Sequence, residues 1–474
     1  MENKPFLVGG KWRASGASFE VRHSWTGETV AQVSIASRDD AEDALAAASS
    51  AATEMRNAPR YERAKALHKI ARILGDRREE FARTIAVEAG KPVAQARGEV
   101  DRAVMTFTFA AEEARRFTGE MIPLDGQASG TGRAGFTERI PRGIIFGITP
   151  FNFPLNLVAH KVAPALASAN AIIIKPSPRT PLSSLLLGEA FLASGLPTSA
   201  LQIVPVDVSD VDLFLTDERV GMISFTGSAE VGWRLRERAA RKQVTLELGG
   251  NAPVIVDETA NIEYAVERTA LAAFAYAGQT CISAQRILLH EQVAGEFTSR
   301  FVERAQKMRA GDPFDEHTEL SNMIDEAAAR RVENWINEAT EAGARLLCGG
   351  VRRGALLEPT ILTDVHSELR VLTEEVFAPV ATIQRFTDFA DAIAEANNTR
   401  YGLQAGVFTK NLERAFLAHR ELQFGGVIIN DAPFFRTDNM PYGGVKLSGA
   451  GREGVRYAME EMTEPRLLVI DPQL

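Results

Sequence analysis

Cys281 is the first residue whose type and setting indicate covalent chemistry. It lies in the run Tyr276-Ala-Gly-Gln-Thr-Cys281-Ile-Ser, after a stretch rich in Ala, Leu and Phe. A thiol at the point where an apolar helix gives way to a glycine-containing segment can lie at the floor of a cleft with its sulfur free. The second cysteine, Cys348, lies in a loop-like Cys-Gly-Gly-Val segment. The alternative role for Cys281 is that of a small, inert, buried side chain, which is commoner for a lone cysteine.

Two other segments supply what acyl chemistry on a thiol requires, namely donors for an oxyanion and a base for water. Asn152 lies in Pro150-Phe-Asn-Phe-Pro154 and carries an amide that can donate. Glu247 lies in Leu246-Glu-Leu-Gly-Gly250. Its leucine neighbours predict a pKa raised by desolvation, which suits a general base near neutral pH. The three segments together favour a nucleophilic role for Cys281.

The elements that must position these groups alternate between short apolar strands and helices. The alternation predicts strands at 143–148, 171–174, 201–206, 221–225, 252–256 and 286–289, with helices at 157–169, 211–215, 262–275 and 293–308. Strands joined by crossover helices form open parallel sheets that bind ligands at the C-terminal ends of the strands. We therefore expect an α/β fold with two Rossmann-like open sheets, divided at the Gly249-Gly250-Asn251 segment.

Three further segments complete the predicted organisation. Residues 38–117 are rich in charge and alanine, with apolar residues at helical spacing, and are interpreted as a scaffold of amphipathic helices. The polar residues 125–133 indicate a projecting hairpin or connection, and the apolar run Arg466–Ile470 indicates a terminal strand. Both would leave sheet edges exposed in a monomer.

Composition limits the classes of function. The chain has 474 residues, of which 45% are hydrophobic and 24% charged, with a net charge of −9. This length predicts about two to four domains of roughly 100–200 residues each. The composition argues against a disordered, collagen-like or membrane-spanning chain. The negative charge gives no bulk field that would attract nucleic acid or anionic lipid.

Cysteine use and the N-terminal residues favour the cytoplasm. Two cysteines form no disulfide framework, and a nucleophilic thiol suits a reducing compartment. The N-terminal residues are too polar for a signal peptide, and no apolar run reaches the ~18 residues of a spanning helix. The seven histidines form no ligand-spaced cluster with either cysteine, so no metal is expected.

One motif is rejected as a nucleotide site. Gly130-Thr-Gly-Arg-Ala-Gly135 matches GxGxxG literally, but it follows a polar stretch and the next residues do not open a helix. Without the strand, turn and helix the glycines cannot direct backbone amides at a pyrophosphate.

From about residue 5 to about residue 470 the chain resembles the aldehyde dehydrogenase superfamily. Seven motifs in one order carry the resemblance: Pro150-Phe-Asn-Phe-Pro154, Lys175-Pro-Ser, Phe225-Thr-Gly-Ser228 with Val231-Gly232, Leu246-Glu-Leu-Gly-Gly250, Gly278-Gln-Thr-Cys281, Glu374-Glu-Val-Phe-Ala-Pro379, and Pro441-Tyr-Gly-Gly-Val-Lys446 with Ser448-Gly449. The resemblance implies that Cys281 attacks an aldehyde, that Asn152 and the Cys281 N–H hold the oxyanion, and that Glu247 activates water to hydrolyse the thioester. The domains implied are a cofactor-binding domain (1–120 and 141–249), a catalytic domain (250–446) and an oligomerisation element (121–140 and 447–474).

The resemblance also implies NAD or NADP as the hydride acceptor. Its cofactor-binding residues would be Ile148, Thr149, Pro150, Phe151, Lys175, Ser177, Phe225, Gly227, Ser228, Val231, Leu248, Gly249, Glu375 and Phe377. Two departures concern the adenosine end. Pro178, followed by Arg179, stands where NAD-dependent members commonly carry a glutamate, so we expect NADP to be accepted. Residues 206–210 replace the usual glycine-rich turn.

The substrate side is predicted from fewer signals. Candidate lining residues are Met105, Phe153, His160, Arg286, Phe434, Phe435 and Arg436. Either arginine could pair with a carboxylate, phosphate or phosphonate, and the segments around 155–161 and 436–444 are similar to members that act on short, polar or anionic aldehydes. The alternatives are structural salt bridges for both arginines and a packed core position for His160. Thr280 precedes the cysteine, where one branch of non-phosphorylating glyceraldehyde-3-phosphate dehydrogenases carries a basic residue. This difference argues against membership of that branch without excluding it.

Two other activities remain open at this point. A coenzyme A-acylating enzyme of the same fold would release the thioester to a thiol, but such members tend to lack the acid at the Glu247 position. A catalytically silent structural homologue would not need Cys281, Asn152 and Glu247 together. The resemblance further implies a homodimer or homotetramer assembled through the exposed strands.

Overall fold

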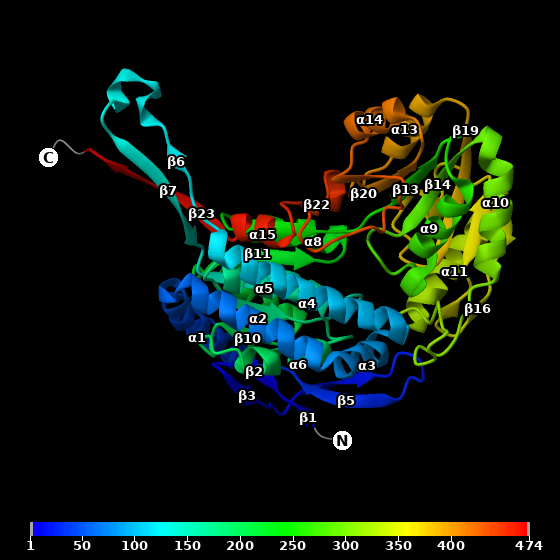
Figure 1. Ribbon diagram of the computed structural model, residues 1–474. Helices are drawn as coiled ribbons and strands as arrows, with labels where there is room; N and C mark the ends of the chain where they lie inside the picture. Colours follow the sequence, from blue (N-terminus) through cyan, green and yellow to red (C-terminus); the bar gives the residue numbers. More distant parts are fainter. Residues whose placement is uncertain (1–2, 472–474) are drawn as a thin grey trace.

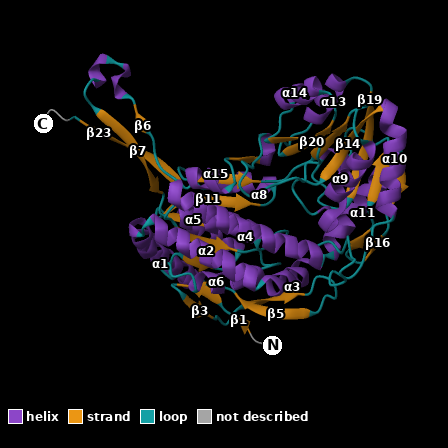
Figure 2. Cartoon of the chain, viewed as in Figure 1, coloured by secondary structure: helices purple, strands orange, loops and turns teal. Residues whose placement is uncertain are grey.

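The computed structural model describes residues 3–471 as two lobes, with a β-hairpin that projects from one of them (Figure 1). Each lobe is built on a sheet flanked by helices (Figure 2). The predicted α/β fold with two open sheets is confirmed.

The first sheet has eight strands, and its five central strands run parallel. The strands at both edges are antiparallel to their neighbours, which the alternating sequence pattern did not indicate. In order across the sheet the strands are β22 (Gly449–Ala450), β12 (Gln243–Glu247), β11 (Val220–Thr226), β8 (Ile144–Ile148), β9 (Ala171–Lys175), β10 (Leu201–Ile203), β2 (Phe6–Val8) and β3 (Lys11–Arg13).

The second sheet has seven strands, which are parallel except for the edge strand β15. Across the sheet they are β15 (Arg345–Cys348), β18 (Thr360–Thr363), β19 (Val380–Phe386), β14 (Ala284–His290), β13 (Ala252–Val256), β20 (Gln404–Phe408) and β21 (Gly426–Ile429). Val254 and Val256 of β13 pack with α9 and α10 in one apolar cluster, whereas Ile255 packs with α13 and α14 in another. This period of two explains why a strand covered on both faces is apolar throughout.

Helices cover the sheets of both lobes. In the first lobe they are α1 (Arg38–Asn57), α2 (Arg60–Asp76), α3 (Arg78–Ala89), α4 (Val93–Arg116), α5 (Asn156–Ala167), α6 (Leu182–Leu192), α7 (Val211–Thr216), α8 (Ala229–Arg238) and α15 (Val455–Glu461). In the second lobe they are α9 (Ile262–Phe274), α10 (Glu291–Gln306), α11 (Glu326–Glu341), α12 (Arg370–Thr373), α13 (Phe389–Asn397) and α14 (Leu412–Glu421).

The projecting element is a three-stranded antiparallel sheet of β6 (Met121–Ile122), β7 (Ala134–Pro141) and β23 (Thr463–Ile470). Its tip holds two short turns, η1 (Leu124–Gly126) and η2 (Ala128–Gly130), where an extended connection or hairpin was expected. The rejected Gly130–Gly135 motif runs from this tip into β7, and no helix follows it. Smaller sheets join β1 (Asn3–Lys4), β5 (Thr29–Ser34) and β4 (Ser18–Arg22), and pair β16 (Arg352–Arg353) with β17 (Leu356–Leu357).

Several element boundaries differ from the sequence prediction. The strand expected to reach residue 206 ends at Ile203, and the strand expected from residue 286 begins at Ala284. The helix predicted at 157–169 begins at Asn156 and ends at Ala167. Within the predicted oligomerisation segment 447–474, β22 pairs with the first sheet and α15 packs beside α5, so only β23 joins the projecting hairpin. Within residues 3–471, no helix has the length and apolar character needed to cross a bilayer.

Candidate functional site

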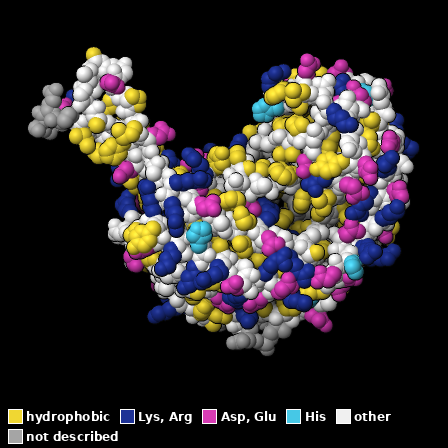
Figure 3. All heavy atoms as spheres, viewed as in Figure 1, with side chains coloured by type: hydrophobic (Ala, Val, Ile, Leu, Met, Phe, Trp, Pro, Cys, Tyr) yellow, Lys and Arg dark blue, Asp and Glu magenta, His cyan; other side chains and the backbone are white. Residues whose placement is uncertain are grey.

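A cavity of about 630 Å³ lies between the two lobes, where the surface is visibly hollowed (Figure 3). Segments that follow β8, β11 and β12 form one wall, as expected for the C-terminal ends of parallel strands. The second lobe contributes the segment before β14, which carries Cys281. The predicted site residues on its wall are Pro150, Phe151, Asn152, Phe153, Gly227, Ser228, Glu247, Leu248, Gly249, Cys281, Phe434, Glu375, Phe377 and Arg436.

A strained turn sets the position of the cysteine. After α9 the residues Tyr276, Ala277 and Gly278 all have left-handed backbone conformations, with φ of +50°, +52° and +66°. Such angles are uncommon for residues other than glycine and persist only where the surroundings enforce them. The Tyr276 hydroxyl donates to the Ala89 carbonyl at 2.9 Å. A side chain on Gly278 would collide with the Ala378 carbonyl. These contacts fix the path of the chain that reaches Cys281.

The Cys281 side chain packs against the small apolar cluster of Ile282, Leu403 and Tyr442. Its Sγ is 3.0 Å from the Tyr442 hydroxyl. Burial raises the pKa of the thiol to about 12, and the contact with Tyr442 lowers it in part. Burial thus opposes loss of the thiol proton.

Asn152 reaches the cysteine segment from the first lobe. Its amide nitrogen donates to the Gln279 carbonyl at 2.9 Å, which uses one of its two N–H groups. Its amide oxygen is buried and has no hydrogen-bond partner among the described residues. A buried polar atom without a partner is unusual and marks a place where a ligand or water can bind.

Glu247 ends β12 with a carboxylate that forms no ion pair among the described residues, although the charges of Arg436, Lys161 and Arg452 lie near enough to favour its ionised form. Only 3% of the residue is exposed, and neither carboxylate oxygen has a hydrogen-bond partner among residues 3–471. Burial raises its pKa well above the ordinary value, and the nearby charge of Glu453 adds to this. The raised pKa expected from the flanking leucines is therefore present, although a second carboxylate contributes to it.

Glu375 lies against the glycine segment that joins the two lobes. One of its oxygens accepts from the Gly250 N–H at 3.0 Å, and a side chain on Gly249 would collide with the other. Burial raises the pKa of Glu375 to about 7. The absence of side chains at Gly249 and Gly250 leaves room for this carboxylate at the cavity wall.

A different set of predicted residues lies outside the cavity wall. These are Ile148, Thr149, Lys175, Ser177, Phe225 and Val231, all on the first lobe, together with Met105, Phe435, His160 and Arg286. Lys175 ends β9, and burial lowers its pKa while Asp207 opposes the shift. Arg179 forms an ion pair with Asp325 at 2.6 Å. The charges that act on Lys175 thus include the carboxylate of Asp207, which the prediction of NADP binding did not consider.

Arg286 and His160 do not occupy the substrate positions predicted for them. Arg286 is 1% exposed and donates to the carbonyls of Glu395 and Ala396 at 3.0 and 2.7 Å, so it binds the end of α13. His160 is equally buried on α5 and contacts Asp438 at 2.8 Å. His160 therefore occupies a packed core position, which was the alternative to a role in substrate binding. Arg286 serves as a hydrogen-bond donor inside the second lobe.

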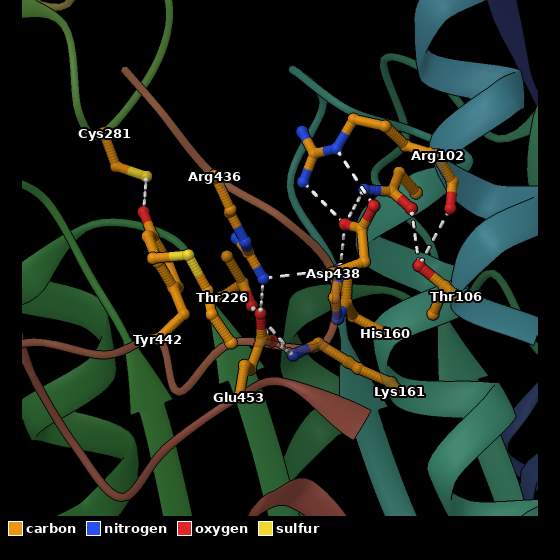
Figure 4. A network of polar contacts seen from close by, with 12 residues as sticks. Arg102, Thr106, His160, Lys161, Thr226, Cys281, Arg436, Asp438, Tyr442 and Glu453 are labelled. Atoms are coloured by element: carbon orange, nitrogen blue, oxygen red, sulfur yellow. Dashed lines mark hydrogen bonds and ion pairs between the residues drawn. The ribbon is translucent and has the colours of Figure 1, made fainter. Parts of the chain in front are cut away.

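Arg436 belongs to a buried network of alternating charges (Figure 4). Its guanidinium donates to Glu453 at 3.1 Å, and Glu453 pairs with Lys161 at 3.2 Å. Burial alone would raise the pKa of Glu453, but Lys161, His160 and Arg436 outweigh it and lower the pKa to about 2. Next to this pair, Asp438 binds His160 and accepts from Arg102 at 2.7 Å.

Sequence reasoning missed Arg102, Tyr442 and Glu453, which all line the cavity. Arg102 lies on α4, within the stretch interpreted as scaffold, and nothing in its helical spacing separates it from the other arginines there. Tyr442 belongs to the motif Pro441-Tyr-Gly-Gly-Val-Lys446, but no role was predicted for it from the sequence. Residues 3–471 contain no group of three or more His, Cys, Asp or Glu side chains placed to hold a metal ion.

Comparisons with known proteins find the same family over nearly the whole length of the chain. The model of the aldehyde dehydrogenase family matches residues 12–468. The chain is 42% identical to 3-sulfolactaldehyde dehydrogenase of Priestia aryabhattai over 465 residues, which cover 98% of this chain and 97% of that protein.

Two solved structures show the same likeness. Aldehyde dehydrogenase 21 of Physcomitrella patens, in complex with the reaction product succinate, superposes with a TM-score of 0.98 at 43% identity, covering 100% of this chain and 99% of that one. Glyceraldehyde-3-phosphate dehydrogenase of Methanocaldococcus jannaschii, complexed with NADP, gives 0.92 at 39% identity, covering 96% and 100%. The chain therefore belongs to the aldehyde dehydrogenase family.

Proposed function

We propose that this enzyme oxidises a short aldehyde with an anionic substituent to the carboxylate, with Cys281 as nucleophile, Asn152 as oxyanion donor and Glu247 as general base. One observation carries the assignment of roles: the unpartnered carboxylate of Glu247 and the thiol of Cys281 face the same cavity from opposite lobes. A buried carboxylate with free oxygens and a raised pKa is suited to take a proton from water.

In the first step the Cys281 thiol loses its proton to water, and the resulting thiolate attacks the aldehyde carbon. The S–C bond forms, the carbonyl pair moves to oxygen, and a thiohemiacetal results. The second N–H of the Asn152 amide is free to donate to the new oxyanion, because the first is held by Gln279. Holding that amide in place before charge develops lowers the cost of reorganisation in the transition state.

Hydride acceptance is the chemistry that a bound nicotinamide dinucleotide supplies. Loss of hydride leaves a thioester on Cys281, and Glu247 then takes a proton from water as the hydroxyl adds to the thioester carbon. The C–S bond breaks, which releases the carboxylic acid and the cysteine. Retention of Glu247 favours hydrolysis over transfer to coenzyme A.

The cavity wall fits NAD or NADP at its nicotinamide end. Ser228 caps α8 without a side-chain hydrogen bond, so its hydroxyl and the amides of the helix N-terminus are available for a pyrophosphate. Glu375 and the glycine segment before β13 offer a carboxylate beside side-chain-free backbone, which suits ribose hydroxyls. Related structures contain NADP or NAD⁺.

The anionic substituent is proposed from the arginines of the cavity. Arg436 and Arg102 both line it, and each has only one ion-paired carboxylate partner among the described residues. Guanidinium groups bind carboxylates and phosphates through paired N–H donors. Three relatives are named for, or were crystallised with, sulfolactaldehyde, succinate or glyceraldehyde 3-phosphate. Each of these compounds carries an anionic group.

A substrate panel tests this function. Succinic semialdehyde, glyceraldehyde 3-phosphate and 3-sulfolactaldehyde would be compared with propionaldehyde and neutral lactaldehyde, each with NAD and with NADP. We expect kcat/KM to favour at least one anionic aldehyde by about tenfold or more, as one charge-assisted hydrogen bond predicts. Equal kcat/KM values for all the anionic and neutral aldehydes would refute the substrate class.

We further infer a homodimer or homotetramer formed through the projecting sheet. Leu467, Leu468, Val469 and Ile470 on β23 are 44–56% exposed, and apolar side chains gather on this element in Figure 3. An exposed apolar edge strand is a place where a second chain adds. Light scattering that shows only a monomer at micromolar concentration would contradict this assembly.

A further inference from the structure

The Tyr442 hydroxyl is the polar side-chain group recorded in contact with the Cys281 sulfur. The distance from hydroxyl oxygen to Sγ is 3.0 Å, and Figure 4 shows the phenol pointing at the thiol. Tyr442 is 3% exposed and lines the cavity. The contact therefore joins a buried phenol to a partly exposed cysteine at the cavity wall.

Contacts on both sides hold the phenol in this position. The Arg436 guanidinium lies 3.7 Å from the centroid of the Tyr442 ring. The backbone of Tyr442 is bonded to that of Glu453 in both directions, at 3.0 and 2.6 Å. Because Glu453 also binds Arg436, the ring, the guanidinium and the carboxylate form one rigid unit.

We propose that Tyr442 is a catalytic residue whose hydroxyl donates a hydrogen bond to the Cys281 thiolate, stabilising it and aiming it at the aldehyde. The inference rests on the proposed nucleophilic role of Cys281. When the thiol loses its proton, the sulfur becomes an acceptor only, so the phenol keeps its own proton and donates. A positive charge over the ring makes the phenol a stronger donor.

The hydrogen bond weakens as the reaction proceeds. Charge leaves the sulfur when the S–C bond forms and appears on the carbonyl oxygen, where the Asn152 amide is available. Tyr442 thus raises the population of thiolate, which burial otherwise suppresses, at some cost in the nucleophilicity of that thiolate. The gain in thiolate population and the loss in nucleophilicity together set the expected change in the alkylation rate of Cys281.

The test is the alkylation rate of Cys281 in the free protein, comparing wild type with Tyr442→Phe. Iodoacetamide is added at several pH values between 7 and 10, and the Cys281 peptide is quantified by mass spectrometry, so that Cys348 does not interfere. Loss of one charge-assisted hydrogen bond raises the thiol pKa by about one to two units. Since a more basic thiolate reacts faster, roughly half of this is regained, and we expect alkylation to slow about threefold to tenfold.

A fluorinated tyrosine at position 442 gives the opposite prediction. 3,5-Difluorotyrosine has a more acidic phenol and donates more strongly, so alkylation should become faster at each pH where the phenol stays protonated. Tyr264→Phe is the matched control, because Tyr264 lies on α9 with 46% exposure and outside the cavity wall. An unchanged or faster rate in Tyr442→Phe overturns the proposal, since it would mean that the phenol holds an unreactive thiol.

Alkylation requires neither aldehyde nor cofactor, so this inference and the proposed function fail separately. If the wild type oxidises no aldehyde but the two Tyr442 variants shift alkylation in opposite directions, only the function is refuted. If turnover falls in Tyr442→Phe while alkylation is unchanged, the role assigned to the phenol is refuted. The Phe side chain keeps the ring beneath Arg436, and a thermal unfolding curve checks that the variant is folded.

Discussion

Glu247 and Glu453 are buried carboxylates on the same cavity, and their surroundings are opposite. Glu247, at the end of β12, has no hydrogen-bond partner among the described residues, and its pKa is raised well above the ordinary value. Glu453, in the segment before α15, binds Lys161 and Arg436, and its pKa is lowered to about 2. Each carboxylate also affects the other, because the negative charge of Glu453 disfavours ionisation of Glu247.

The difference separates the groups proposed to react from those that hold them. Reacting groups must have free atoms: the Glu247 oxygens are unpartnered in the described part of the chain, and the Asn152 amide nitrogen donates once, to Gln279, which leaves its second N–H for an oxyanion. In the network around Glu453 each charged side chain has an ion-paired partner, which is the condition under which buried charges persist, although the Arg436 Nε has no hydrogen-bond partner among the described residues. The cavity therefore combines the carboxylate of Glu247, which is without a partner within residues 3–471, with a set of charges that are paired with one another.

The largest effect is expected when the unpartnered carboxylate is neutralised. Glu247→Gln should lower the rate of steady-state acid formation about 10²- to 10⁴-fold, the usual contribution of a general base. Hydride transfer before hydrolysis should be less affected, so a burst of reduced cofactor should precede slow turnover, with acyl-enzyme detectable by mass spectrometry. Rapid turnover by the variant in the absence of coenzyme A would remove Glu247 from the mechanism.

The same substitution should not destabilise the fold. A glutamate whose pKa is raised on folding lowers stability as pH rises above the ordinary value of 4.5, because the unfolded chain ionises first. Glu247→Gln removes this penalty, so its free energy of unfolding near pH 7 should equal or exceed that of the wild type. Urea unfolding measures the difference.

Neutralising the paired carboxylate should have the reverse result. Glu453→Gln leaves Lys161 and Arg436 buried without their partner, which costs about 3–5 kcal/mol of unfolding free energy. A lowered pKa stabilises the fold above the ordinary value of 4.5, and this contribution is lost as pH falls toward about 2. The gap between wild type and variant should therefore be full above pH 4.5 and shrink below it. Glu316→Gln, which breaks an exposed pair with Arg97, is the control and should change little.

The contrast between Glu247 and Glu453 shows which features of the site could be predicted from the sequence. Glu247 stands in a short apolar run, so its burial and raised pKa were predictable from its neighbours. Glu453 stands in Gly451-Arg-Glu-Gly454, a polar turn that indicates solvent, and its burial arises from contacts with Lys161 of α5 and with the segment of Arg436 and Tyr442. Parallel strands and crossover helices follow from local apolar pattern, whereas partners in different segments, such as Lys161 and Glu453, do not.

Arg436→Ala tests whether the paired end also recognises substrate. We expect kcat/KM on an anionic aldehyde to fall about tenfold to a hundredfold more than on propionaldehyde, because a charge-assisted hydrogen bond is lost. The ratio is the informative quantity, since loss of Arg436 also removes one of the two cations paired with Glu453 and lowers both activities. Arg102→Ala, whose side chain is 31% exposed, should change the ratio in the same direction by less. An unchanged ratio in both variants would leave the anion without a binding group.

The smallest effect is expected at the adenosine end. Lys175 has Asp207 as its opposing charge, and Val204 at the end of β10 bonds to Ile174 of β9, which places the segment of Asp207 beside that of Lys175. The sequence departure at Pro178 predicts that a 2′-phosphate is accepted, and a negative charge at Asp207 would oppose that preference. Asp207→Asn should raise the ratio of kcat/KM for NADP over NAD by up to about fivefold, the size of one exposed charge interaction. Asp210→Asn, three residues further on, is the matched control. A fall in that ratio in Asp207→Asn would mean that Asp207 positions Lys175 for the phosphate.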